Sequence, residues 1–93
     1  MKTLKIPYEL KKMGEIFESH GFEAFLVGGA VRDMILGKKA ADYDVATNAR
    51  PEDVIKIFNR VILTGIKHGT VTVHFMKMEI EVTTYRTESE YTD

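Results

Sequence analysis

The chain begins with apolar residues that recur at the period of a helix: Leu10, Met13, Ile16 and Phe17. Pro7 suits the first turn of a helix, and Gly21 suits the position just after its last turn. We therefore predict a helix over Pro7–His20. The apolar residues on its one face would pack against the rest of the domain.

The next apolar run is short and lies between glycines. Residues 23–27 read Glu-Ala-Phe-Leu-Val, and a short apolar run of this kind is typical of a buried central strand. Gly28 and Gly29 then turn the chain into a short helix that Gly37 ends. Its apolar face is formed by Val31, Met34 and Ile35. Residues 42–46 are expected to form a second strand.

The second half of the chain continues the alternation of helix and strand. Pro51 and the acids after it predict the start of a third helix, which would end near Asn59. A third strand is expected over Val61–Leu63. Residues 71–75 and 78–82 then alternate between apolar and polar, so they predict a hairpin that turns at Met76-Lys77. This order predicts an α/β (α+β) fold, a mixed sheet with flanking helices.

Composition narrows the class of protein. The chain has 93 residues, of which 44% are hydrophobic and 29% charged, as in globular proteins. We expect one domain over residues 1–93 and no second domain. There is no cysteine, which excludes disulfides and thiolate metal sites. We find neither a signal peptide nor a membrane span, and so expect a cytoplasmic protein without a membrane partner.

The net charge bears on nucleic-acid binding. Thirteen basic residues are set against 14 acidic ones, which gives a formal net charge of −1. Proteins that hold nucleic acids through their phosphates usually carry an excess of Lys and Arg. If the chain acts on a nucleic acid, most of the affinity must therefore come from another polypeptide or from a part that is absent here.

The sequence Asp42-Tyr43-Asp44 is the first candidate for chemistry. Side chains alternate along a strand, so Asp42 and Asp44 would share a face about 6.5–7 Å apart. Two carboxylates so placed can bind hard cations, and Mg²⁺ commonly takes one or two carboxylates together with phosphates of a substrate. The alternative is a solvated acidic turn, which is the commoner meaning of two aspartates separated by one residue.

The glycine pair and the residues after it are the second candidate. Gly28 and Gly29 lie where a strand meets a helix, so their backbone N–H groups can approach an anion at the positive end of the helix dipole. Arg32 can bind a phosphate, and Asp33 can hold an arginine or cap backbone groups. The alternatives are a plain turn and a surface ion pair, which contributes little stability.

The last strand offers further carboxylates. Glu79 and Glu81 share the face opposite its apolar residues. If this strand lies beside residues 42–44, one of these glutamates could assist a metal site. The alternative is an exposed polar strand face. The three histidines show no ligand spacing, so zinc is unsupported.

Several short sequence motifs occur in an order that is specific to one family. They are Leu26-Val-Gly-Gly-Ala-Val-Arg-Asp33, Leu36-Gly37, Asp42-Tyr-Asp-Val-Ala-Thr47, Lys67-His-Gly-Thr-Val71 and Glu81-Val-Thr-Thr-Tyr-Arg86, followed by Glu88 and Tyr91. In these motifs the chain resembles the class II tRNA nucleotidyltransferases, which comprise the CCA-adding enzymes and the bacterial poly(A) polymerases. The resemblance is to their N-terminal head domain and covers roughly residues 22–93.

The resemblance implies a DNA polymerase β-like nucleotidyltransferase fold and metal-dependent transfer of nucleotides from ATP or CTP to the 3′ end of an RNA. By the same resemblance, Asp42 and Asp44 would bind two Mg²⁺ ions, and Glu81 would be an auxiliary catalytic carboxylate. One ion would activate the RNA 3′-hydroxyl, and the other would neutralise the triphosphate and the leaving pyrophosphate. The triphosphate would lie at Gly28, Gly29, Arg32 and Asp33.

The resemblance also implies segments that this chain does not contain. In the family, an Arg-Arg-Asp segment, a base-selecting Glu-Asp-x-x-Arg segment and tRNA-binding helical domains follow, and this chain ends at Asp93 before them. We therefore expect weak Mg²⁺ and nucleotide binding and little selective addition from the chain alone. The chain would be either an excised fragment or one piece of a split enzyme, and in the second case a complementing polypeptide or a homo-oligomer would supply the rest. The alternative is a non-catalytic nucleotide-binding or assembly module of the same fold.

Overall fold

The structure is a computed structural model that describes residues 6–37 and 43–85. Its strands form one five-stranded sheet in the order β1-β2-β5-β4-β3. The strands are β1 (Ala24–Val27), β2 (Tyr43–Thr47), β3 (Val61–Gly65), β4 (Thr70–Phe75) and β5 (Met78–Thr84). The helices are α1 (Tyr8–Ser19), α2 (Gly29–Ile35), α3 (Pro51–Ile57) and the 3₁₀ turn η1 (Ile66–His68). The predicted mixed sheet is confirmed, because β2 and β5 are parallel and the other pairs antiparallel.

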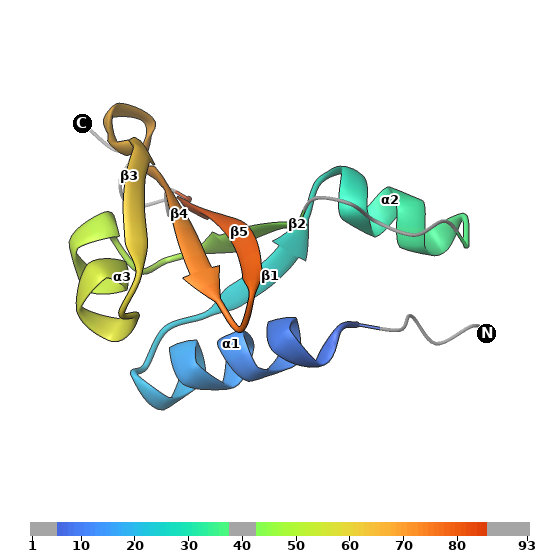
Figure 1. Ribbon diagram of the computed structural model, residues 1–93, viewed down its shortest axis with the longest axis horizontal. Coiled ribbons are helices and arrows are strands. Elements are labelled where there is room, and N and C mark those ends of the chain that lie inside the picture. The colour runs from blue at the N-terminus through green and yellow to red at the C-terminus, as the bar shows by residue number, and fades with distance from the viewer. Residues whose placement is uncertain (1–5, 38–42, 86–93) are drawn as a thin grey trace, which may run out of the picture.

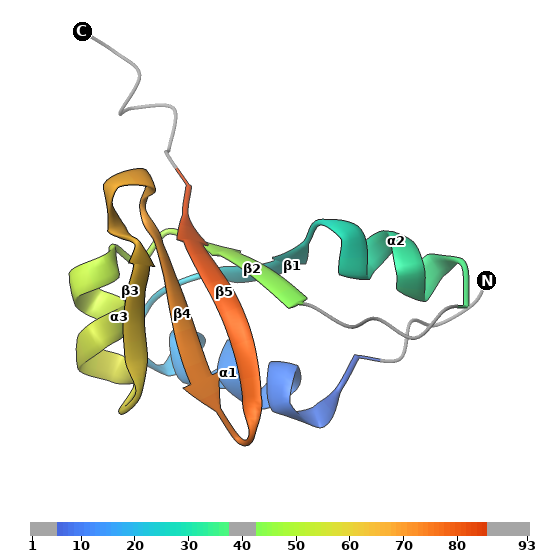
Figure 2. The same cartoon turned by 45° about the horizontal axis from the view of Figure 1, so that its top comes forward.

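Helices α1 and α3 pack on the same face of the sheet, whereas α2 projects from its end (Figure 1). In the part of the chain that the structure describes, the opposite face carries no helix, and Figure 2 shows the strands from that side. We call it the open face. The core lies between the sheet and the two helices and consists of Leu10, Met13, Phe17, Val45, Ala49, Val54, Phe58, Val71, Val73, Ile80 and Val82.

Aromatic contacts fasten both helices to the core. Phe17 of α1 is fully buried, and its ring meets that of Phe58 edge to face at a centroid distance of 5.3 Å. Phe58 follows α3 directly and makes a second edge-to-face contact with Phe75 of β4 at 5.6 Å. Contacts of this geometry add to the area that the rings bury. They tie α1, α3 and the sheet into one body.

The helix ends follow the predicted signals to within a residue or two. Pro7 is the N-cap of α1 rather than its first residue. Behind the last turn, Gly21 has a φ of +85°, and its N–H donates to Glu18 while the N–H of Phe22 donates to Phe17. This pair of bonds is the Schellman arrangement, in which a residue with positive φ satisfies the last carbonyls of a helix.

The hairpin of β4 and β5 turns where the alternation predicted. Phe75 pairs with Met78, so only Met76 and Lys77 form the loop. Both have positive φ, at 49° and 70°. Two such residues in succession make the type I′ turn that matches the twist of two-residue hairpins. The sequence gives no sign of this backbone, since neither residue is glycine, asparagine or aspartate.

The prediction of a buried central strand at residues 23–27 is wrong. β1 lies at an edge of the sheet and, among the described residues, pairs only with β2. Ala24 and Leu26 face the helices, whereas Phe25 and Val27 lie on the open face and are 53% and 38% exposed. The run is apolar on both sides because the open face of this strand carries apolar side chains, not because a layer of the described chain covers it.

Within the described residues, no helix is long and apolar enough to cross a membrane.

Candidate active site at the end of the sheet

Asp44 and Glu81 are neighbours on the open face. β2 and β5 run parallel, and their register places Asp44 opposite Glu81. Directly paired residues of adjacent strands point to the same face, and such strands lie about 4.8 Å apart. The last strand therefore lies beside Asp44, which is the condition under which one of its glutamates could assist a metal site. Asp44 is half-buried and Glu81 is exposed.

Gly28 lies against the Asp44 carboxylate. A Cβ atom built on Gly28 would be 2.8 Å from Oδ2 of Asp44, closer than real Cβ contacts come. The φ and ψ of Gly28 are +81° and −156°, in a region that is essentially restricted to glycine. Two separate requirements therefore fix glycine here. The first is the turn from β1 into α2, and the second is room for the carboxylate.

Helix α2, which follows Gly28 directly, carries the remaining residues that were predicted for the triphosphate site. Gly29 is the first residue of the helix, and a terminal nitrogen of Arg32 lies 3.5 Å from where a Cβ of Gly29 would be. Nε of Arg32 is 3.6 Å from Oδ1 of Asp33, while the Arg32 side chain is 73% exposed. The guanidinium group thus lies over the glycine turn and remains open to a solvent-borne anion.

Asp42 lies outside the described residues, so the prediction that it shares a face with Asp44 stays a prediction. Among residues 6–37 and 43–85, no three His, Asp or Glu side chains lie close enough together to hold a metal ion. Within the described chain, the acidic part of the site is therefore the pair of Asp44 and Glu81.

Glu79 is placed differently from Glu81. It pairs with His74 of β4 across the hairpin, and its Oε1 is 3.7 Å from Nε2 of His74. In the described register, Glu79 has no partner on β2, because the pairing of β2 with β5 begins at Tyr43 and Ile80. Of the two glutamates that the sequence offered, Glu81 is therefore the one beside Asp44.

An aromatic contact on the open face was missed by reasoning from sequence. Phe25 and Tyr85 lie with their ring centroids 6.3 Å apart. The Tyr85 hydroxyl donates a hydrogen bond of 2.6 Å to Oε2 of Glu23. This bond, together with the negative charge of Glu23, raises the pKa of Tyr85 above its ordinary value. The only signal in the sequence was an aromatic residue at an outward position of a strand.

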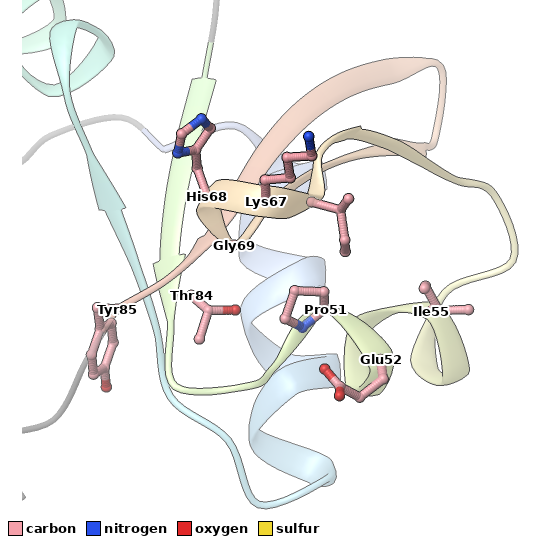
Figure 3. A pocket seen from close by; sticks show the side chains of 9 residues that line it. Pro51, Glu52, Ile55, Lys67, His68, Gly69, Thr84 and Tyr85 are labelled. Atoms are coloured by element: carbon pink, nitrogen blue, oxygen red, sulfur yellow. The ribbon is translucent and has the colours of Figure 1, made fainter. Parts of the chain in front are cut away.

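A hollow of about 700 Å³ lies at the C-terminal end of β5, between α3 and η1. Figure 3 shows its lining, which comes from α3, from η1 and the glycine after it, and from the end of β5 with the residue that follows it. Its lining includes Lys67, His68 and Glu52, but none of the predicted site residues. Thr84 lies three residues beyond Glu81 along β5. The predicted site is thus a surface at the end of β1 and β2, separate from this hollow.

Comparison with protein families matches residues 24–93 to the poly A polymerase head domain. The chain belongs to this family. A CCA-adding enzyme of Lactococcus lactis is 48% identical to it over 99 aligned positions, which cover 100% of this chain and 25% of that protein. A CCA-adding enzyme of Enterococcus faecalis is 47% identical and is covered to 24%. This head-domain chain thus spans about a quarter of the length of these relatives.

Solved structures agree with the family assignment. The head-domain chain superposes on the crystal structure of the Bacillus stearothermophilus CCA-adding enzyme in complex with CTP with a TM-score of 0.80. The identity is 47%, and the match covers 85% of this chain and 20% of that one. A tRNA nucleotidyltransferase complexed with a primer tRNA and an incoming ATP analog matches with a TM-score of 0.65 and 28% identity, over 86% of this chain and 24% of that one. The predicted nucleotidyltransferase fold is therefore confirmed.

Proposed function

We propose that this chain carries the metal- and triphosphate-binding part of an RNA 3′-end nucleotidyltransferase that adds CCA to tRNA from CTP and ATP. The observation that carries the proposal is the placement of Asp44 beside Glu81 with Gly28 against the Asp44 carboxylate. Family membership gives the class of reaction. Relatives that are 47–48% identical to this chain are CCA-adding enzymes, which favours CCA addition over poly(A) addition.

The residues present fit a divalent cation. Carboxylates on neighbouring strands offer the oxygen ligands that Mg²⁺ prefers, and the site is open enough for the ion to keep waters and bind substrate phosphates. Asp44 and Glu81 would hold it, with Asp42 as the further ligand that the family pattern implies. Bound there, Mg²⁺ would supply positive charge next to the reacting phosphate.

The glycine turn would receive the triphosphate. Gly28 and Gly29 leave the backbone of the turn free of side chains, and the Arg32 guanidinium lies over the turn with most of its surface exposed. A planar guanidinium can donate two parallel hydrogen bonds to a phosphate. Asp33, 3.6 Å from Arg32, would orient that guanidinium rather than contact the anion, because carboxylate and phosphate repel each other.

The reaction itself is a displacement at the α-phosphorus. The oxygen of the RNA 3′-hydroxyl forms a bond to that phosphorus, the bond to the pyrophosphate breaks, and the hydroxyl proton leaves to solvent. Phosphoryl transfers of this kind depend mainly on positioning and on stabilisation of charge, so a small head domain can carry much of the machinery.

Calorimetric titration with CTP, with and without Mg²⁺, tests the proposal. We expect weak binding that requires Mg²⁺ and that Asp44→Asn abolishes, because the substitution removes the negative charge and leaves the size of the side chain. Glu81→Gln should weaken the binding as well. Glu52→Gln is the matched control, since Glu52 is an exposed acid that lines the separate hollow. Binding that is independent of Mg²⁺, or equal in Asp44→Asn and wild type, would contradict the proposal.

A further inference from the structure

Phe25, which is exposed, and Tyr85, which is half-buried, form an aromatic pair that we call the ring pair. The ring planes are inclined by 40° at a centroid distance of 6.3 Å. Phe25 is 53% exposed, although it sits within a strand. Single apolar residues on a surface are common, but adjacent aromatic rings on one face mark a place where a flat apolar group can bind.

The ring pair is held in place by its backbone and by Glu23. The N–H of Tyr85 donates to the carbonyl of Thr47 at 2.9 Å, and its hydroxyl donates to Glu23 at 2.6 Å. Phe25 belongs to β1 and pairs in register with Ala46. Fixed rings lose little conformational entropy when a ligand stacks on them, which favours binding.

The ring pair and the candidate active site share the open face. Val27 pairs with Asp44, and Phe25 lies two residues before Val27. Phe25 is therefore displaced from the level of Asp44 by about 6.5–7 Å along the strand. Across the strands from Phe25, the side chains on the open face are small. Ala46 pairs with Phe25 on one side and with Thr83 on the other. A chain of nucleotides could therefore run along the face from the rings to Asp44.

The geometry of the reaction indicates which substrate would bind at the ring pair, and this step rests on the proposed function. Gly28 and α2 follow β1 beyond Val27, so a triphosphate bound at the glycine turn would lie on one side of Asp44 and the ring pair on the other. In phosphoryl transfer the attacking and leaving oxygens lie roughly in line across the phosphorus. The 3′-hydroxyl must therefore arrive from the side of the ring pair.

We propose that the ring pair stacks a base at the 3′ end of the acceptor RNA and so guides its 3′-hydroxyl towards Asp44. Every base has a flat π face, so stacking tolerates different bases and needs no excess of positive charge. That suits a chain whose net charge is −1.

The test uses the 93-residue chain with Mg²⁺ and a short single-stranded RNA that carries 2-aminopurine near its 3′ end. Stacking quenches this fluorophore, so wild type should quench it on titration. Phe25→Ala should weaken RNA binding by about 5- to 150-fold, the range measured for the loss of one stacked base. Phe25→Tyr, which keeps a ring, should restore it. Ile62→Ala is the matched control, because Ile62 of β3 also lies on the open face and is 48% exposed.

The results separate this inference from the proposed function. The stacking role would be overturned if wild type does not quench the 2-aminopurine fluorescence, or if Phe25→Ala binds the RNA as tightly as wild type does. Mg²⁺-dependent CTP binding would be unaffected by either result. A dimer of this chain that Phe25→Ala dissociates, with RNA binding unchanged, would assign the ring pair to a second copy and also overturn it. Absence of Mg²⁺-dependent CTP binding in wild type would instead overturn the proposed function.

Discussion

Replacing Gly28 by alanine should damage both the stability of the fold and the metal site. The new Cβ would lie 2.8 Å from Oδ2 of Asp44, so the carboxylate or the backbone must move. The backbone of Gly28 also has φ +81° and ψ −156°, which alanine adopts only under strain. We expect the carboxylate to be displaced and its affinity for Mg²⁺ to fall.

The loss of stability in Gly28→Ala is the sum of the backbone strain and the cost of displacing the Asp44 carboxylate. Holding alanine in this backbone region destabilises by about 1–3 kcal/mol. Turning a side chain about 30° from its rotamer adds about 0.5–1.5 kcal/mol. We therefore expect the free energy of unfolding to fall by about 2–4 kcal/mol. For a domain of this size, each kcal/mol shifts the Tm by about 4–8 °C, so thermal unfolding should show a loss of roughly 8–30 °C.

A double-mutant cycle separates the two terms. In an Asp44→Ala background the carboxylate is gone, so Gly28→Ala should retain only the backbone strain. Gly21→Ala is a control for a positive φ without a close contact, because Gly21 has a φ of +85° and nothing within 4 Å of its Cβ position. If Gly28→Ala lowers the Tm by the same amount in both backgrounds, the close approach to Asp44 has no energetic consequence and the reasoning is refuted.

Further predictions concern stability. Gly14→Ala should raise the free energy of unfolding by about 0.5–1 kcal/mol, because Gly14 lies inside α1 with open space at its Cβ position; a lower Tm would contradict this. Lys77→Gly should also raise the free energy of unfolding by about 0.5–1 kcal/mol, because Lys77 has a φ of 70°, which glycine adopts without strain. Chemical unfolding measures this change. The raised pKa of Tyr85 predicts stabilisation that is complete below pH 10 and is lost as the pH rises through the folded-state pKa. Thermal melts at pH 8–11 should therefore show a steeper loss for wild type than for Tyr85→Phe, and equal slopes would contradict the role of Glu23.

The sequence predicted most elements of the fold because their patterns are local. Helical spacing located α1, and alternation located the hairpin of β4 and β5 together with its turn at Met76. The pairing of the strands could not be predicted from local patterns, because the parallel pairing of β2 with β5 depends on contacts between segments that are far apart in the chain. The same limit explains the error at β1, where an apolar run is compatible with a central strand and with an edge whose outer side chains are apolar.

The candidate site was predictable in its residue types and not in its arrangement. The sequence marked Gly28 as a residue that lets the backbone approach an anion. The structure adds that its missing side chain also makes room for Asp44. Spacing alone did not distinguish Glu79 from Glu81; the resemblance favoured Glu81, and the register of β5 places that residue beside Asp44. The contact of Phe25 with Tyr85 joins residues 60 positions apart, and no spacing rule connects them.

We claim that Asp44 and Glu81 form a cation site next to the glycine turn. The most direct test replaces Mg²⁺ by Mn²⁺, which accepts the same oxygen ligands, and follows the paramagnetic broadening of amide signals by NMR. We predict broadening centred on Gly28, Asp44 and Glu81 that disappears in Asp44→Asn. Broadening centred instead on Glu52 and His68, or broadening that survives unchanged in Asp44→Asn, would contradict the claim.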